Sequence, residues 1–144
     1  IEKGHAAGNE LNGQITAQNL GLEKMMSKKK DFVGNVLSRR SELNKESIVK
    51  LVGFKPVNKE IELKAGVHFI SLGKEACTKN DEGWMSSVAF SPSLNHSIGL
   101  GFIKNGNNRI GEIVNAVDPL RKSNIEVEIV SPHFLDPEGE RLRE

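Results

Sequence analysis

Cysteine is nearly absent from this 144-residue sequence, which contains a single example, Cys77. An intramolecular disulfide is therefore excluded. The four histidines are spread along the chain and do not have the spacing of a zinc site. They are His5, His68, His96 and His133. We expect no metal centre and a reducing, cytoplasmic setting.

Net charge and long apolar runs are also scarce. Lys and Arg together number 20 and Asp and Glu 19, and the two signs are interspersed. Such a chain has no extended basic field that would attract nucleic acid or an anionic membrane. Its longest apolar runs, such as residues 47–54, are far shorter than the roughly 20 residues that cross a bilayer, and no cleavable signal pattern is present. The sequence predicts a soluble protein that binds neither nucleic acid nor membrane.

The amino-acid composition of the chain changes at about residue 46. Residues 1–46 are rich in polar residues and glycine, have few β-branched residues and do not suggest a self-sufficient core. Asp31 is a candidate N-cap, and apolar residues then recur at helical spacing, which predicts a helix near 31–43. Because the chain begins at Ile1 with neither Met nor a cap residue, we expect it to be a fragment of a longer polypeptide.

Residues 47–144 have short apolar runs separated by Gly, Pro, Asn and Asp, a pattern typical of all-β domains. The predicted strands are 47–54, 67–72, 84–90, 97–103, 109–117 and 125–130. We predict a fold that is mainly β, and α+β overall. A small antiparallel β-barrel or jelly-roll-like C-terminal domain would follow a short helical remnant of an α/β domain.

Gly99 and Gly101 lie two residues apart in the predicted strand 97–103. They do not form a dinucleotide fingerprint, because Lys104 occupies the third glycine position and no helix follows. Both glycines would lie on the same side of the strand. We therefore predict that a bend or a crossing neighbour needs room there.

Candidate nucleophiles give no catalytic site. Ser91, His96 and Asp81 supply the residue types of a catalytic triad, but no G-x-S-x-G elbow surrounds the serine. Its pairing with Pro92 is typical of a turn. Cys77 has no histidine near it in the sequence, which predicts a passive thiol.

Three other features have a structural and a functional interpretation. The run Lys28-Lys29-Lys30 is typical of a solvated loop, but three ammonium groups before a helix can also hold a carboxylate or a phosphate. Trp84, the only tryptophan, is predicted to be a core or edge anchor rather than a stacking platform. His133 is expected to bond to the backbone through its ring nitrogens.

Taken together, several segments resemble the folate-dependent aminomethyltransferase family, which includes the T-protein of the glycine cleavage system. Residues 31–34, DFVG, are similar to the D-F-[IV]-G step that follows the family's middle domain. Residues 82–101 resemble the signature G-x-x-T-S-G…S-P-T-L-G-x-S-I-A-L-A of its C-terminal barrel. Residues 1–5, IEKGH, and 131–142, SPHFLDPEGERL, resemble the α subunits of heterotetrameric sarcosine oxidases, whose C-terminal half is built like the T-protein.

The resemblance implies that residues 1–46 end a folate-binding middle domain and that residues 47–144 form the C-terminal barrel domain. It implies an oxidoreductase acting on CH–NH donors with oxygen as acceptor. Sarcosine would be oxidised at a flavin on a partner subunit, and tetrahydrofolate would capture the one-carbon unit. FAD, FMN and NAD are expected in the full hetero-oligomeric complex rather than in this chain.

Few of the implied folate contacts fall within this chain. Glu2 matches the glutamate of the family's [RK]-[IL]-E-x-G motif, which implies a carboxylate that binds the pterin ring through two parallel hydrogen bonds. Lys28, Lys29 and Lys30 fall where the T-protein has an arginine that contacts folate, so one of them is implied to pair with a folate carboxylate. A further family arginine falls at about Asp136, where this sequence departs from the pattern.

No catalytic residue is expected, because the family's catalytic aspartate lies upstream of Ile1, and the chain alone is expected to be inactive. Two other functions stay open at this point. The chain could belong to a T-protein or to a dimethylglycine-type demethylase, which the sequence upstream of Ile1 would decide. It could also be a non-enzymatic β-barrel interaction module, which would bind no reduced folate.

Overall fold

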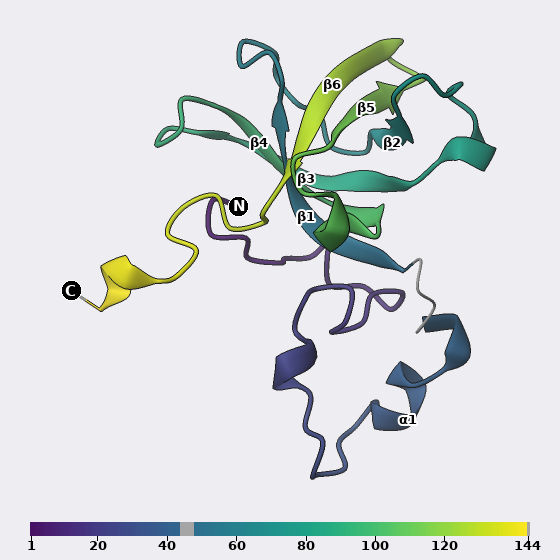
Figure 1. Cartoon of the computed structure of the whole chain (residues 1–144), viewed down its shortest axis with the longest axis vertical. Helices are drawn as coiled ribbons and strands as arrows, with labels where there is room; N and C mark the ends of the chain where they lie inside the picture. The colour runs from purple at the N-terminus through teal and green to yellow at the C-terminus, as the bar shows by residue number, and fades with distance from the viewer. Residues whose placement is uncertain (44–47, 144) are drawn as a thin grey trace.

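The computed structural model describes residues 1–43 and 48–143, which form a closed antiparallel β-barrel with extensions at both ends (Figure 1). The strands are β1 Val49–Pro56, β2 His68–Ser71, β3 Gly83–Ser91, β4 His96–Lys104, β5 Ile113–Asp118 and β6 Ser123–Val130. Their order around the barrel is β1-β4-β3-β2-β5-β6, and β6 pairs with β1 to close it. The prediction of a mainly β fold with a small antiparallel barrel is confirmed.

Helical structure in the described residues is limited to short segments. The one α-helical turn is α1 Asn35–Ser38, and the 3-10 turns are η1 Glu23–Met25, η2 Ser41–Leu43, η3 Thr78–Asn80, η4 Gly106–Arg109 and η5 Glu140–Leu142. Residues 44–47, which include the predicted domain boundary and the predicted start of the first strand, lie outside the described residues.

The predicted helix near 31–43 is wrong, because α1 and η2 take its place. Gly34 has a φ of +91°, in the left-handed region that a right-handed helix cannot pass through. The carboxylate of Asp31 accepts hydrogen bonds from the amide of Phe32 at 3.1 Å and the side chain of Asn35 at 2.9 Å. Asp31 therefore stabilises the bend before Gly34 instead of capping a long helix.

The predicted strand 109–117 starts too early, since β5 begins at Ile113. Gly111 has a φ of +90°, which interrupts an extended strand, and Arg109 ends η4. The guanidinium of Arg109 pairs with Glu112 at 2.6 Å and with Glu82 at 2.7 Å. This ion-pair network holds the residues before β5 in a turn.

Glu82 is the centre of that network. Its carboxylate also accepts hydrogen bonds from the Ser71 hydroxyl at 2.6 Å and from Lys74 at 3.2 Å. Burial raises the pKa of Glu82, but these hydrogen bonds and the Arg109 charge outweigh it and hold the pKa below its ordinary value. The hydrogen bonds to Glu112 and Glu82 in turn raise the pKa of Arg109. The network ties β2, the residue before β3 and η4 together beside the barrel wall.

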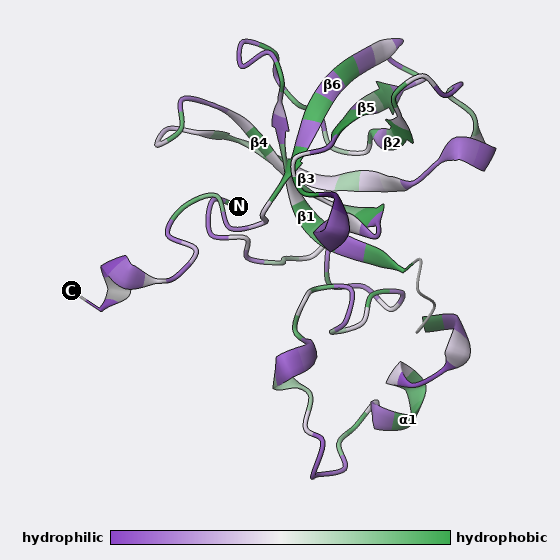
Figure 2. Cartoon of the chain, viewed as in Figure 1, coloured by the Kyte–Doolittle hydropathy of each residue, from purple (hydrophilic) through white to green (hydrophobic). Residues whose placement is uncertain are grey.

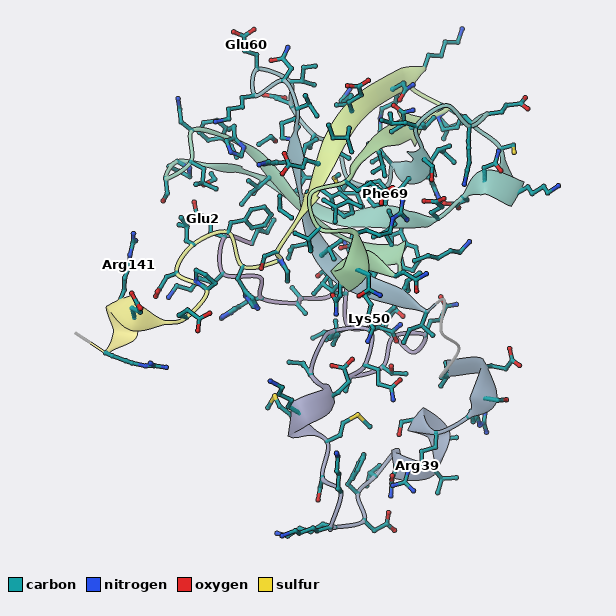
Figure 3. The ribbon with its side chains drawn as sticks, viewed as in Figure 1. Glu2, Arg39, Lys50, Glu60, Phe69 and Arg141 are labelled. Carbon is teal, nitrogen blue, oxygen red and sulfur yellow. The ribbon has the colours of Figure 1, made fainter. Side chains whose placement is uncertain are left out.

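The barrel interior is filled by apolar side chains from all six strands and from the loop between β1 and β2. Phe54 and Phe69 stack with their ring centroids 4.0 Å apart, and Figure 3 shows Phe69 inside the barrel. The other buried members of this cluster are Val52, Leu63, Val67, Met85, Ile103, Val114, Ala116, Val127 and Ile129. Burying these side chains is the main favourable contribution to the stability of the barrel.

A second apolar cluster lies on the outer side of β1, β3 and β4. Its buried residues are Leu51, Leu100 and Phe102, and the partly buried side chains against them are Ile1, Ala6, Ile15, Leu20, Val49, Trp84 and Phe134. Trp84 is partly buried and lies 5.3 Å from Phe102 between ring centroids, so the prediction that it is a core or edge anchor is confirmed. The N-terminal segment and the chain after β6 are therefore packed on the barrel.

Gly99 and Gly101 face β3 at close range. A Cβ at Gly99 would lie 2.8 Å from the sulfur of Met85, and one at Gly101 would lie 2.6 Å from the carbonyl oxygen of Trp84. The predicted steric role of the two glycines is confirmed.

Residues 22–43 extend away from the barrel and expose apolar side chains (Figure 2). These are Leu22, Met25, Val33, Val36 and Leu37, with exposed fractions of 43%, 79%, 104%, 80% and 52%. The segment is joined to β1 by Lys50, whose ammonium lies 2.5 Å from Glu23 and 2.6 Å from the carbonyl oxygen of Gln18.

Candidate functional site

Glu2 lies against the barrel, in a turn that the C-terminal segment crosses. The amides of Phe134 and Leu135 donate to its carbonyl oxygen at 2.9 and 3.1 Å. The Ser91 hydroxyl donates to the Oε1 atom of its carboxylate. The Oε2 atom makes no hydrogen bond with the described residues. Both the backbone and the side chain of Glu2 are thus positioned, and part of the carboxylate can still accept hydrogen bonds.

Ser91 is held in place by its own local structure. It is fully buried at the end of β3, and its Oγ accepts a hydrogen bond from the amide of Leu94 at 3.1 Å. Pro92 follows, and Asn95 completes the turn to β4 with a left-handed φ of +56°. The sequence identified Ser91 only as a turn residue. Its contact with Glu2 was missed because 89 positions separate the two residues.

Glu10 is a buried carboxylate that sequence reasoning also missed. Its oxygens accept hydrogen bonds from the hydroxyls of Ser86 and Ser87 and from the amide of Ala7 at 2.9 Å. Burial raises the pKa of Glu10, but these three hydrogen bonds outweigh it and hold the pKa below its ordinary value. Through these hydrogen bonds Glu10 anchors the N-terminal segment to the bulge in β3 between Met85 and Ser87.

The lysine cluster lies far from Glu2. Lys28, Lys29 and Lys30 are exposed in the loop at the outer end of the 22–43 segment, whereas the N-terminus lies beside the barrel (Figure 1). The amides of Lys29 and Lys30 donate to the Ser27 hydroxyl at 3.2 and 2.9 Å. The loop surrounds an open hollow of about 530 Å³ that also includes Glu23. The structure does not bring Glu2 and the lysines together.

The residue types of a triad are not assembled. The carboxylate of Asp81 pairs with the imidazole of His68 at 2.8 Å, while the Nδ1 of His96 donates to the carbonyl oxygen of Ser97 at 2.8 Å. Ser91 instead bonds to Glu2. Asp81 thus pairs with His68 rather than with His96, which lies opposite Ser91 across β3 and β4.

A cavity of about 300 Å³ beside β2 contains Cys77. His68 and Asp81 line the same cavity together with apolar residues, and the imidazole of His68 pairs with Asp81 rather than with the thiol. No group of three or more metal-ligating side chains occurs within residues 1–43 and 48–143.

Two further expectations concern the C-terminal segment. The Nδ1 of His133 donates to the carbonyl oxygen of Lys3 at 3.0 Å, so the predicted bond to the backbone is made by one of the two ring nitrogens. The carboxylate of Asp136 accepts hydrogen bonds from the amides of Glu140 and Arg141, so it caps the turn η5. In the part of the chain that the structure describes, no helix is long and apolar enough to cross a membrane.

Comparison with known proteins identifies the barrel. Residues 50–136 match the family model of the glycine cleavage T-protein C-terminal barrel domain. The sarcosine oxidase subunit alpha of Rhizobium meliloti is 38% identical over 143 residues, and that of Corynebacterium sp. (strain P-1) is 36% identical over 144 residues. These matches cover 99% and 97% of this chain but only 14% and 15% of the two relatives.

Aminomethyltransferases are also similar to this chain. The enzyme of Thermosipho melanesiensis is 32% identical over 127 residues, which cover 88% of this chain and 32% of the relative. The crystal structure of glycine cleavage system aminomethyltransferase T from Bartonella henselae superposes with a TM-score of 0.73 at 21% identity, over 94% of this chain and 37% of that one. The structural match shows a shared fold.

Proposed function

Because the chain belongs to the glycine cleavage T-protein C-terminal barrel family, we propose that it is the C-terminal part of a sarcosine oxidase α subunit. In this role it contributes to a tetrahydrofolate-binding region that captures the one-carbon unit from the oxidative demethylation of sarcosine. The observation that carries the proposal is the 38% identity with a sarcosine oxidase α subunit over 99% of the chain.

Glu2 is the residue of this chain that we assign to folate. Its carboxylate is oriented by Ser91 and its backbone by the chain after β6, while Oε2 makes no bond within the described residues. A fixed carboxylate that still has free lone pairs suits a pair of N–H donors on a pterin ring. Tetrahydrofolate, when bound, accepts the one-carbon unit. Glu2 binds and orients it, which keeps the reacting group in place.

Lys28, Lys29 and Lys30 have a weaker claim to folate. That one of them pairs with the folate carboxylate stays a prediction, since their loop lies at the outer end of the 22–43 segment, away from the N-terminus (Figure 1). The exposed apolar side chains of residues 22–43 support the assignment of residues 1–46 to the end of a larger domain, because isolated domains rarely expose so many. In that domain the lysine loop would be positioned by further polypeptide.

The complete protein would work as a complex. We propose a cytoplasmic hetero-oligomer whose other subunits and domains hold FAD, FMN and NAD, with oxygen as the electron acceptor. The test is to express the complete α subunit with its partner subunits and to measure sarcosine-dependent hydrogen peroxide formation. The proposal predicts peroxide with sarcosine, and its absence from a fully assembled complex would contradict it.

A second candidate function is favoured by the similarity to aminomethyltransferases at 32% identity. A T-protein would transfer the one-carbon unit to tetrahydrofolate without producing peroxide. The same assay distinguishes the two candidates, because sarcosine-dependent peroxide is expected only from an oxidase.

A further inference from the structure

A groove of about 290 Å³ lies where the end of β1, the loop after it, the start of β4 and the chain after β6 meet. Four side chains with basic nitrogens line this groove, and they are Lys55, Lys59, His96 and His133. We call it the basic groove. No carboxylate lines it. Neither Glu2 nor the lysine loop at residues 28–30 is among its walls, although the amide of Phe134, a wall residue, donates to the carbonyl oxygen of Glu2.

The two histidines each bond to the backbone through the same ring nitrogen, Nδ1. The Nδ1 of His96 bonds to the carbonyl oxygen of Ser97 at 2.8 Å, and the Nδ1 of His133 bonds to that of Lys3 at 3.0 Å. A carbonyl oxygen only accepts hydrogen bonds, so both Nδ1 atoms carry the hydrogen. Neither Nε2 atom makes a hydrogen bond with the described residues. His96 is only 6% exposed, so its ring is held rigidly in the groove wall.

The two lysines differ in how much of their charge is compensated. The ammonium of Lys55 lies 3.1 Å from the carboxylate of Glu128, which neutralises part of its field. Lys59 is exposed and forms no ion pair with the described residues. The groove therefore has an excess of positive charge at the lysine side and two imidazole nitrogens without partners at the other.

We propose that the basic groove binds an oxyanion, the carboxylate or phosphate group of a small ligand. Ammonium groups form charge-assisted hydrogen bonds with such oxygens. An imidazole Nε2 that carries a hydrogen is a further donor to such an oxygen. A metal cation would use the same nitrogens in their neutral form, but the field of the lysines opposes it.

The oxyanion could be a free anion or the carboxylate end of a folate. Inorganic phosphate probes the first source. The second is probed by p-aminobenzoylglutamate, which carries the folate carboxylates without a pterin. Saturable binding of phosphate alone assigns the groove to a free anion, and displacement of phosphate by p-aminobenzoylglutamate assigns it to the folate tail. Both results support an oxyanion site.

The experiment follows the ring signals of His96 and His133 by NMR while the 144-residue chain is titrated with phosphate at constant ionic strength. We expect saturable shifts of both rings, and Lys59→Ala should weaken binding about three- to tenfold. Lys79→Ala removes an equally exposed lysine outside the groove and should leave the affinity unchanged. Shifts that do not saturate with either probe, or an equal loss in Lys79→Ala, would overturn the proposal.

This inference does not depend on the proposed function. Because Glu2 does not line the groove, Glu2→Ala should retain phosphate binding even where it abolishes folate binding. Lys59→Glu gives a second readout, since a reversed charge at an exposed position leaves the fold intact and should abolish the shifts. Retention of parent-like affinity in Lys59→Glu would contradict the proposal.

Discussion

The hydroxyl of Ser91, at the end of β3, donates a hydrogen bond to the carboxylate of Glu2, 89 positions earlier in the chain. This contact joins the family's barrel signature to the N-terminal residue that the resemblance assigns to folate. Through it, a turn that contains no catalytic group could affect the proposed binding site. The turn places a buried hydroxyl, and the hydroxyl orients the carboxylate.

Replacing Ser91 with alanine tests this positioning role. Ser91→Ala leaves the Glu2 carboxylate without its partner, so we expect the complete subunit to bind tetrahydrofolate several-fold more weakly. The free energy of unfolding should fall by about 1–2 kcal/mol, because the amide of Leu94 also loses its acceptor. Folate titration and urea unfolding measure the two effects. Ser93→Ala, two residues away in the exposed part of the turn, is the matched control and should behave like the parent.

Glu10 should be among the polar residues that contribute most to stability. Glu10→Ala removes the acceptor of two hydroxyls and one amide in a buried place, so we expect the free energy of unfolding to fall by about 3 kcal/mol. Urea unfolding monitored through Trp84 fluorescence is a direct measurement. Glu75→Ala changes an exposed glutamate and should stay within about 0.5 kcal/mol of the parent. Equal stability of the two variants would contradict the anchoring role of Glu10.

Stability should decrease in acid through three glutamates. The pKa values of Glu10, Glu82 and Glu112 lie below the ordinary 4.5, so the folded state binds fewer protons than the unfolded state in this range. The stabilisation is therefore fully present above pH 4.5 and is lost as pH falls through the folded pKa values. Urea midpoints should be nearly constant at neutral pH and fall steeply below about pH 4.5. A Glu10→Gln variant should show a shallower fall, and an identical slope would argue against a depressed pKa for Glu10.

Gly101→Ala tests the close approach of β3 and β4. The added Cβ would lie 2.6 Å from the carbonyl oxygen of Trp84, which the sheet cannot relieve without moving a strand. We expect a loss of about 3 kcal/mol or a failure to fold. Gly13→Ala is the control, because a Cβ there meets no atom within 4 Å, and its stability should stay within about 1 kcal/mol of the parent. Thermal unfolding of the two variants gives the comparison.

Local patterns in the sequence predicted much of the barrel. In β6, Val127 and Ile129 are buried as the alternation with glutamates predicts, since a strand with one buried face has a period of two. Gly34 shows where the same approach failed. Helical spacing continued through it, but the sequence does not reveal that its φ is positive. A long helix was therefore expected where one turn forms.

The candidate site was less predictable, because its contacts join distant segments. Glu2 was identified only through a resemblance, and Glu10 was not identified at all. The hydroxyl that bonds to the Glu10 carboxylate belongs to Ser86, 76 positions further along the chain. The sequence around each serine does not predict these contacts, because a serine in a strand or turn has the same sequence neighbours whether or not a distant carboxylate bonds to it. Such pairs depend on how the N-terminal segment packs on the closed barrel.

The assignment of Glu2 to folate is tested by the dissociation constant of tetrahydrofolate for the complete α subunit and for its Glu2→Gln variant. Glutamine keeps the size of the side chain and removes its charge, so the variant should bind about 10- to 100-fold more weakly. Glu62→Gln, at an exposed position on the loop after β1, should match the parent. Parent-like binding by Glu2→Gln would show that this carboxylate does not hold the folate and would contradict the account.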